Sequence, residues 1–218
     1  MTGLIRRIAI ATLACAAMAA PAFAEDSWSE WAPENELGWV EGSADAPVTV
    51  IEYFSPTCSH CKEFAEEVFP VIEETYVSTG KVRFVMREWV RNSVDMTILT
   101  QARCLPDEDG LAYLKDIFAR QDEIFVAAQI GTLPGTLISA STPYGVADRE
   151  AFDACYKNMD TRFDMIEVEK SAEHYDIHAS PTFIVDGVSH AATLTMMTPE
   201  GFSAFLDEEL AKATPPTN

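Results

Sequence analysis

A pair of cysteines three residues apart directly follows an apolar run, and this combination limits the possible folds more than any other feature of the chain. The run Val48–Phe54 is rich in β-branched and aromatic residues and is bounded by Pro47 and Pro56, which predicts a buried strand. The cysteines, Cys58 and Cys61, open a segment whose apolar residues recur at helical spacing. A strand, a turn and a helix that begins with C-x-x-C form the context typical of a redox-active dithiol.

The other elements complete an α/β pattern. Thr57 is expected to cap the first helix, which runs to about Tyr76 with a kink at Pro70. The expected ranges are 81–88, 182–185 and 188–194 for strands, 94–104, 110–121, 148–158, 160–175 and 199–211 for helices, and 131–145 for a Gly- and Pro-rich loop. This order of β-α-β, helices and β-β-α predicts one sheet with helices on both faces and a helical block packed over one edge.

The first 24 residues have the features of a secretory signal peptide. Arg6 and Arg7 precede an apolar run that is shorter than the roughly 20 residues of a membrane span, and Ala22-Phe23-Ala24 predicts cleavage after Ala24. A retained anchor, or a lipoprotein modified at Cys15, is the alternative. The further divisions that we expect are an N-terminal lead-in over 25–45, a sheet domain over 46–92 and 176–212, a helical insertion over 93–175, and a disordered tail over 213–218.

Charge and cysteine content limit the partners and the compartment. The chain holds 15 Lys and Arg against 35 Asp and Glu, for a net charge of −20. A nucleic-acid binder needs a basic surface and an anionic membrane would repel this chain, so neither partner is expected. After residue 24 four cysteines remain, and an even number in an exported protein indicates disulfides.

The two thiols of the motif are expected to differ in reactivity. At a helix N-terminus the free N–H groups and the helix dipole favour a Cys58 thiolate, and His60 could add a positive charge. A thiol of lowered pKa is a good leaving group, so Cys58 is assigned as the sulfur exchanged with substrate and Cys61 as the resolving sulfur. Half of a zinc site, with His174 and His178 as the other half, is one alternative. A buried structural disulfide is the other.

Two further positions could carry function. Glu52 lies inside the apolar strand, where burial would raise its pKa and let it accept the proton of Cys61. A carboxylate that reaches solvent or pairs with a lysine is equally compatible with the sequence. Pro181 precedes a short apolar strand, and a cis bond there would expose backbone groups to an extended substrate chain, although most X–Pro bonds are trans.

Cys104 and Cys155 lie on two predicted helices of the inserted block. If the two are joined, they close a loop of about fifty residues and stabilise the fold by ~4 kcal/mol on the chain-entropy argument. Two buried free thiols are the alternative. No His or Cys stands at metal-binding spacing beside either residue, so the pair is interpreted as a structural bridge.

The chain resembles the DsbA-like thioredoxin-fold family, and within it the alpha-proteobacterial branch of exported thiol-disulfide oxidoreductases. The stretches that carry the resemblance are 46–53, which leads into Cys58-Ser59-His60-Cys61, then 81–85 and 180–187. The order of elements matches over about residues 40–212. The resemblance implies a thioredoxin fold with an inserted helical subdomain.

The resemblance also implies roles for single residues. Cys58 and Cys61 match the redox pair, His60 matches the histidine that favours the thiolate, Glu52 matches the buried acid, and Pro181 matches the cis-proline. These five positions are the catalytic residues that we expect.

Three further implications concern the surroundings of the redox pair. Cys104 and Cys155 match the second, non-catalytic cysteine pair of the branch. Ser59 stands where the best-studied members have proline, and Ser180 stands where Val or Thr is common. Both positions touch the exposed sulfur in the family, so Ser59, Ser180 and Pro181 are the expected substrate-binding residues.

The leading hypothesis is a monomeric periplasmic dithiol oxidase without cofactor or metal. Its substrates would be reduced or misoxidised exported proteins, and a membrane redox partner would reoxidise it. A disulfide isomerase or reductase on the same fold is the first alternative. A metal-binding module that uses the reduced dithiol is the second.

Overall fold

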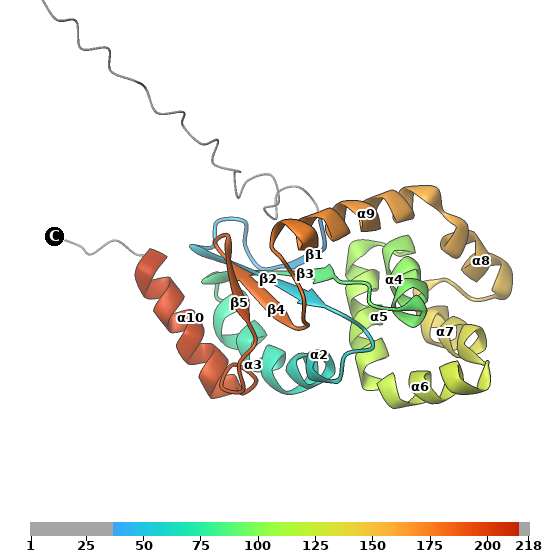
Figure 1. The fold of residues 1–218 in the computed structure, drawn as a ribbon, viewed down its shortest axis with the longest axis horizontal. Helices are drawn as coiled ribbons and strands as arrows, with labels where there is room; N and C mark the ends of the chain where they lie inside the picture. Colours follow the sequence, from blue (N-terminus) through green and yellow to red (C-terminus); the bar gives the residue numbers. More distant parts are fainter. Residues whose placement is uncertain (1–36, 214–218) are drawn as a thin grey trace, which may run out of the picture.

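The structure, a computed structural model, describes residues 37–213 and consists of one five-stranded sheet and the helices around it (Figure 1). The strands lie in the order β1-β3-β2-β4-β5, with β2 and β3 parallel and every other neighbouring pair antiparallel. Their bounds are Trp39–Glu41 for β1, Val48–Phe54 for β2, Val82–Glu88 for β3, Thr182–Val185 for β4 and Val188–Ala191 for β5. The predicted signal peptide, most of the lead-in and residues 214–218 of the tail lie outside the described residues.

The lead-in predicted over 25–45 contains a strand. Trp39, Val40 and Glu41 form β1, which pairs with Met86, Val85 and Phe84 of β3 at one edge of the sheet. Trp39 is 3% exposed. Burial of its large apolar ring therefore holds this short segment in the sheet. The strand was not predicted because the surrounding stretch of sequence is acidic.

The helix after β2 is continuous but irregular. It consists of α2 (Ser59–Glu63), the π-helical turn η2 (Phe64–Val68), α3 (Phe69–Ile72) and a second π-helical turn, η3 (Glu73–Val77). The first π turn ends at Val68, two residues before Pro70, whose missing N–H and bulky ring disturb the regular bonding to the preceding turn. The N-cap is Cys58 rather than the predicted Thr57, so the helix begins one residue later.

Helices fill the chain between β3 and β4. They are α4 (Ser93–Cys104), α5 (Asp107–Ala119), α6 (Gln121–Ile130), α7 (Leu133–Ser141), the 3₁₀ turn η4 (Thr142–Tyr144), α8 (Arg149–Lys157) and α9 (Met159–His174). The prediction of a loop over 131–145 is wrong, because α7 and η4 occupy most of this range. Its glycines and Pro134 lie at the ends and first turn of short helices, where both residue types are tolerated.

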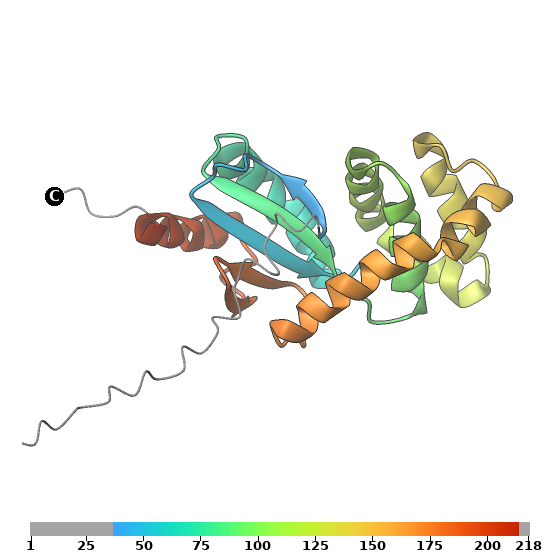
Figure 2. The ribbon, with the colours of Figure 1, turned by 90° about the horizontal axis from the view of Figure 1, so that it is seen from above.

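The helical block lies beyond the carboxyl ends of β2 and β3 and also contacts the edge strand β1 through α5 (Figures 1 and 2). The long helix α9 leads from the block back across the sheet. No helix within residues 37–213 is long and apolar enough to cross a membrane.

Successive side chains of β2 point to opposite faces of the sheet, and the core accordingly forms two clusters. Val50 and Phe54 point to the face that is covered by the helix after β2 and by α10 (Pro199–Ala213). Ile51 and Tyr53 point to the opposite face, where they pack with residues of α9 and the segment after it. Glu52 has the parity of Val50 and Phe54, so the sheet directs it toward the helix that carries the two cysteines.

Candidate active site

Cys58 lies at the junction between a buried loop and a helix N-terminus. Its backbone is extended, with φ −91° and ψ 121°, and its N–H donates to the carbonyl of Ser55 (3.0 Å). Its own carbonyl accepts the first helical hydrogen bond, from the N–H of Lys62 (3.1 Å). The sulfur therefore lies beside the free N–H groups of the first helical turn, where a thiolate is stabilised.

Two buried polar side chains from the helical block hold this loop, and sequence analysis missed both. Asp95 at the start of α4 accepts hydrogen bonds from the hydroxyl of Ser55 (2.9 Å) and the N–H of Thr57 (3.0 Å). Gln121 at the start of α6 donates to the carbonyls of Pro56 (2.8 Å) and Cys58 (3.0 Å). These contacts span tens of residues, so no local pattern indicates them.

The two thiols differ in the way their positions predict. A hydrogen bond from the Cys61 thiol, aided by Ser180 and by the N–H groups of Cys61 and His60, lowers the pKa of Cys58 from 9.0 to about 5, although burial opposes the shift. Burial raises the pKa of Cys61 well above 9.0, and Cys58 and Glu52 raise it further. Cys58 is therefore the stable thiolate of the pair, and Cys61 is the thiol that keeps its proton.

The contribution of the His60 ring to the Cys58 thiolate stays a prediction. Its Nδ1 lies 3.2 Å from Oε2 of Glu63, and the side chain is 66% exposed. The part of His60 that lowers the pKa of Cys58 is its backbone N–H. Any residue other than proline supplies that group, and the imidazole itself faces solvent.

Glu52 is buried on the same face as the cysteines. It lies opposite Met86 of β3 and Phe183 of β4 in the sheet and is 3% exposed. Burial, followed by the charge of Cys58, raises its pKa from 4.5 to about 8. Its charge in turn raises the pKa of Cys61, so the carboxyl group and the inner thiol are electrostatically coupled.

The segment before β4 lies against Cys58. The bond between Ser180 and Pro181 is cis, and the sulfur of Cys58 lies 3.2 Å from the carbonyl oxygen of Ser180, to which it donates when the thiol is protonated. Nη1 of Arg91 donates to the hydroxyl oxygen of Ser180 (3.3 Å). Sequence analysis missed Arg91, which lies in the connection between β3 and α4 and has no recognisable motif.

These groups surround a hollow of about 400 Å³, the cysteine hollow, which is open to solvent. It is lined by Cys58, Ser59, His60, Trp89, Arg91 and Ser180, together with neighbouring residues. A larger hollow of about 650 Å³ lies between β1 and α5, but neither cysteine of the motif lines it. The reactive sulfur and its surroundings identify the smaller hollow as the site.

Of the other candidate residues, His178 lines the cysteine hollow, whereas Cys104, Cys155 and His174 do not. Cys104 and Cys155 form a disulfide between α4 and α8, with a Cα–Cα distance of 5.6 Å, as the resemblance implied. His174 packs against the ring of Tyr175, and His178 pairs with Asp176 (2.9 Å). Within the part of the chain that the structure describes, no group of three or more His, Cys, Asp or Glu is arranged to hold a metal ion.

The fold and the site together define a thioredoxin-fold protein with a dithiol at a helix N-terminus and a helical insertion. The sequence profile of the family described as thioredoxin matches residues 34–208, and the chain belongs to this family. The fold that the resemblance implied is therefore confirmed.

Solved structures show the same fold. Alpha-DsbA1 of Wolbachia pipientis superimposes with a TM-score of 0.68 at 23% identity, over 80% of this chain and 91% of that one. Oxidised BdbD of Bacillus subtilis superimposes with a TM-score of 0.65 at 18% identity, over 81% of this chain and 94% of that one. The DsbA-like arrangement of sheet and inserted helices is thus shared with both proteins.

Sequence relatives match a shorter part of the chain. A protein of Rickettsia bellii that is provisionally named a protein-disulfide oxidoreductase is 34% identical over 90 residues, which cover 41% of this chain and 34% of the relative. Disulfide bond formation protein D of Bacillus subtilis is 42% identical over 45 residues, which cover 21% of this chain and 20% of that protein. The matched region thus spans about a third of the first relative and a fifth of the second.

Proposed function

We propose that the protein is an exported thiol-disulfide oxidoreductase that works as a dithiol oxidase, passing the Cys58–Cys61 disulfide to cysteines of exported proteins. The single observation that carries the proposal is the difference between the two thiols. A Cys58 pKa of about 5 stabilises the reduced enzyme as a thiolate, and that stabilisation drives electrons from substrate to enzyme.

The reaction proceeds by two exchanges. A substrate thiolate attacks the sulfur of Cys58, forming a mixed disulfide and breaking the bond to Cys61, whose sulfur takes the electron pair. Glu52, protonated below its pKa of about 8, donates a proton to the departing Cys61 sulfur. A second substrate thiolate then attacks the substrate sulfur of the mixed disulfide, and Cys58 leaves as its stable thiolate. The substrate is oxidised by two electrons and the enzyme dithiol is reduced by two.

The surroundings of Cys58 support the first exchange. The carbonyl of Ser180 lies 3.2 Å from the sulfur, next to Pro181 and the edge of the hollow. Ser59, Ser180 and Pro181 are the positions where an extended substrate chain would contact the enzyme. The imidazole of His60, exposed at the rim, would meet the same chain.

The setting of the reaction follows from the sequence. A signal peptide ending at Ala24 and an even number of cysteines after it support export to the periplasm. After each turnover the reduced dithiol needs an electron acceptor, for which a membrane redox partner is the natural class. We propose that the enzyme acts as a monomer.

The test is the reduction potential of the Cys58–Cys61 couple, measured together with the oxidation of a reduced two-cysteine peptide. A potential near about −120 mV with rapid peptide oxidation is expected for a strong oxidant. A potential near about −270 mV is typical of a reductant and contradicts the oxidase proposal. Faster rearrangement of a scrambled protein than oxidation of a reduced one indicates an isomerase, and tight stoichiometric zinc or copper binding without thiol exchange indicates a metal-binding module.

A further inference from the structure

Three adjoining hollows run from Cys58 along helix α9. The second, the acidic hollow, has a volume of about 310 Å³ and shares Trp89 and His178 with the cysteine hollow. The third, the methionine hollow, has a volume of about 460 Å³ and shares Glu169 with the acidic hollow. Val90, which lines the methionine hollow, lies between two residues of the cysteine hollow, Trp89 and Arg91. The three hollows therefore adjoin one another on one side of the molecule, and together they are called the groove.

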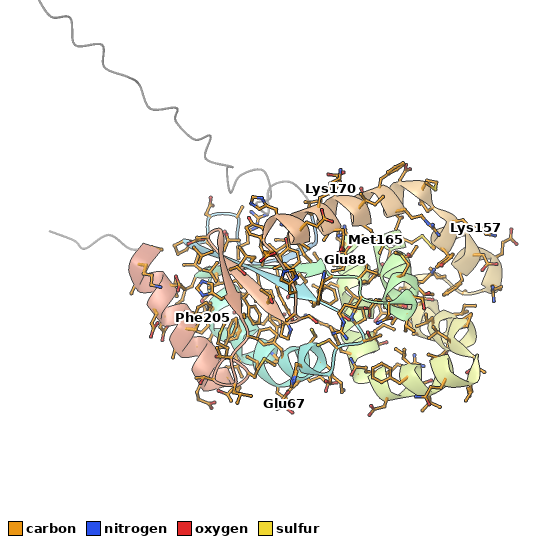
Figure 3. The ribbon with its side chains drawn as sticks, in the orientation of Figure 1. Glu67, Glu88, Lys157, Met165, Lys170 and Phe205 are labelled. Carbon is orange, nitrogen blue, oxygen red and sulfur yellow. A yellow bond between two sulfur atoms is a disulfide. The ribbon has the colours of Figure 1, made fainter. Side chains whose placement is uncertain are left out.

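The methionine hollow is apolar and adaptable. Val90, Met96, Met159, Met165 and Ile166 supply its apolar lining. Met165 is buried and contacts the hydroxyl of Thr100, whereas Met159 and Ile166 are 57% and 49% exposed. Figure 3 shows Met165 below the ribbon of α9. Methionine side chains adjust to differently shaped apolar partners, which suits a site that accepts many sequences.

The acidic hollow carries a concentration of negative charge between the two other hollows. Glu169, Glu173 and Asp176 line it. Burial, followed by the charges of Glu173 and Glu88, raises the pKa of Glu169. Carboxylates that repel one another in this way are stabilised by a cation placed among them. A lysine or arginine of a bound chain would supply that cation.

The groove has the dimensions of an extended peptide. Met159, Arg162, Ile166, Glu169 and Glu173 recur every three or four residues and so form one stripe along α9. At 1.5 Å per residue, this stripe is about 21 Å long. An extended chain of about six residues covers the same length.

We propose that this groove binds the segment of a substrate polypeptide next to its reactive cysteine, and that it favours a basic residue near the cysteine followed by an apolar residue farther along. The substrate cysteine reacts at Cys58 of the enzyme, and the basic residue of the substrate lies beside Glu169, Glu173 and Asp176. The apolar side chain of the substrate enters the methionine hollow. This inference deepens the proposed function, because it names the sequence class of the substrates and the surface that selects them.

The first experiment measures the rate at which the oxidised enzyme reacts with single-cysteine peptides of about twelve residues. Across the set of peptides, a lysine and a leucine keep a fixed separation from each other. The pair is shifted by one residue from peptide to peptide, first on one side of the cysteine and then on the other. We expect the best spacing to react roughly tenfold faster than a peptide with serine in place of leucine. Equal rates for all spacings and for the serine peptide contradict the inference.

Matched variants locate the effect on the enzyme. Ile166→Glu places a charge in the methionine hollow at an exposed position, and Ile130→Glu makes the same change at a 68% exposed position on α6, away from the groove. We expect Ile166→Glu to remove the leucine preference and Ile130→Glu to keep it. Glu169→Lys should weaken the charge preference, so that a lysine peptide loses most of its rate advantage over a glutamate peptide, because Glu173 and Asp176 then share the hollow with a cation. Equal effects of Ile166→Glu and Ile130→Glu, or an unchanged charge preference, contradict the inference.

A binding measurement separates this inference from the proposed function. The Cys58→Ser variant, titrated with a fluorescent peptide in which serine replaces cysteine, reports the groove without any thiol exchange. Tight binding that Ile166→Glu weakens supports the groove even if the enzyme proves not to be an oxidase. Binding unaffected by Ile166→Glu contradicts it, as does a concentration-dependent dimer that Ile166→Glu dissociates, since the groove would then join two copies of the chain.

Discussion

The sulfur of Cys58 is held as a thiolate by donors that come from its own helical turn and from Ser180. The thiolate contributes to the stability of the reduced protein because its pKa is lower in the folded chain, about 5, than in the unfolded chain, about 9. The contribution is complete above pH 9, falls as the pH falls from 9 to 5, and is absent below 5. The reduced enzyme is therefore stabilised most at alkaline pH, and about half of the contribution remains near pH 7.

This gives a prediction for the reduced protein. The absorbance of the Cys58 thiolate should titrate with a midpoint near pH 5. The free energy of unfolding of the reduced protein, relative to reduced Cys58→Ser, should fall by about 1.4 kcal/mol for each pH unit between pH 8 and 6. Urea unfolding at a series of pH values measures the second quantity. A titration midpoint near pH 9 with no pH-dependent difference contradicts this account of the site.

Glu52 has the opposite effect on stability. Its pKa is raised from 4.5 to about 8 in the fold, so the folded protein keeps a proton that the unfolded chain loses. Glu52→Gln should therefore stabilise the protein increasingly as the pH rises from 4.5 to 8. The same variant cannot supply the proton to Cys61, so the oxidation of a reduced peptide at pH 7 should slow roughly a hundredfold. An unchanged rate would remove Glu52 from the mechanism and leave it a structural residue.

At the scale of single elements, the edge strand β1 depends on packing rather than on local sequence. Trp39 packs against Phe54, its ring lies under the guanidinium of Arg103, and its indole nitrogen approaches Gly110 of α5. Arg103 also pairs with the buried Glu88 through two hydrogen bonds of 2.8 and 2.7 Å. These contacts join the sheet to the helical block next to the disulfide at Cys104.

Two glycine substitutions test this packing. A Cβ added at Gly110 would lie 2.6 Å from Nε1 of Trp39 and 2.7 Å from the carbonyl oxygen of Ala102, whereas a Cβ at Gly135 of α7 meets nothing within 4 Å. Gly110→Ala should destabilise the protein by about 1–3 kcal/mol because the helix and the tryptophan must move apart. Gly135→Ala should be neutral or stabilise it by up to about 1 kcal/mol. Denaturant unfolding of the two variants measures both values, and equal effects would show that β1 packs loosely.

At the scale of the whole molecule, the net charge of −20 acts on every approaching substrate. The acidic surface should increase the association rate constant of a basic reduced peptide. This rate constant should fall by about tenfold as the salt concentration rises from about 0.01 to 0.15 M. A neutral peptide of the same length should show little dependence on salt. Stopped-flow oxidation kinetics with both peptides make the comparison, and equal salt dependence contradicts electrostatic steering.

The local chemistry of the site could be predicted because it depends on neighbours in the sequence. The C-x-x-C spacing, the strand before it and the parity of Glu52 place both sulfurs and the acid on one face. The resemblance supplied the cis bond at Pro181 and the disulfide between Cys104 and Cys155, which local patterns left undecided. The helix start was misplaced by one residue, because Thr57 bonds to Asp95 rather than to the helix.

By itself, the sequence determined strands β2 to β5, the helices other than α6 and α7, and the dithiol, since each follows from periodicity or spacing over a few residues. Only the tertiary structure decided which distant groups meet at Cys58: Asp95 and Gln121 beneath the loop, Arg91 on Ser180, and α9 along the groove. It also decided that Trp39 starts the sheet. These outcomes depend on side-chain burial and on hydrogen bonds between segments tens of residues apart, and such partners have no fixed spacing in the sequence.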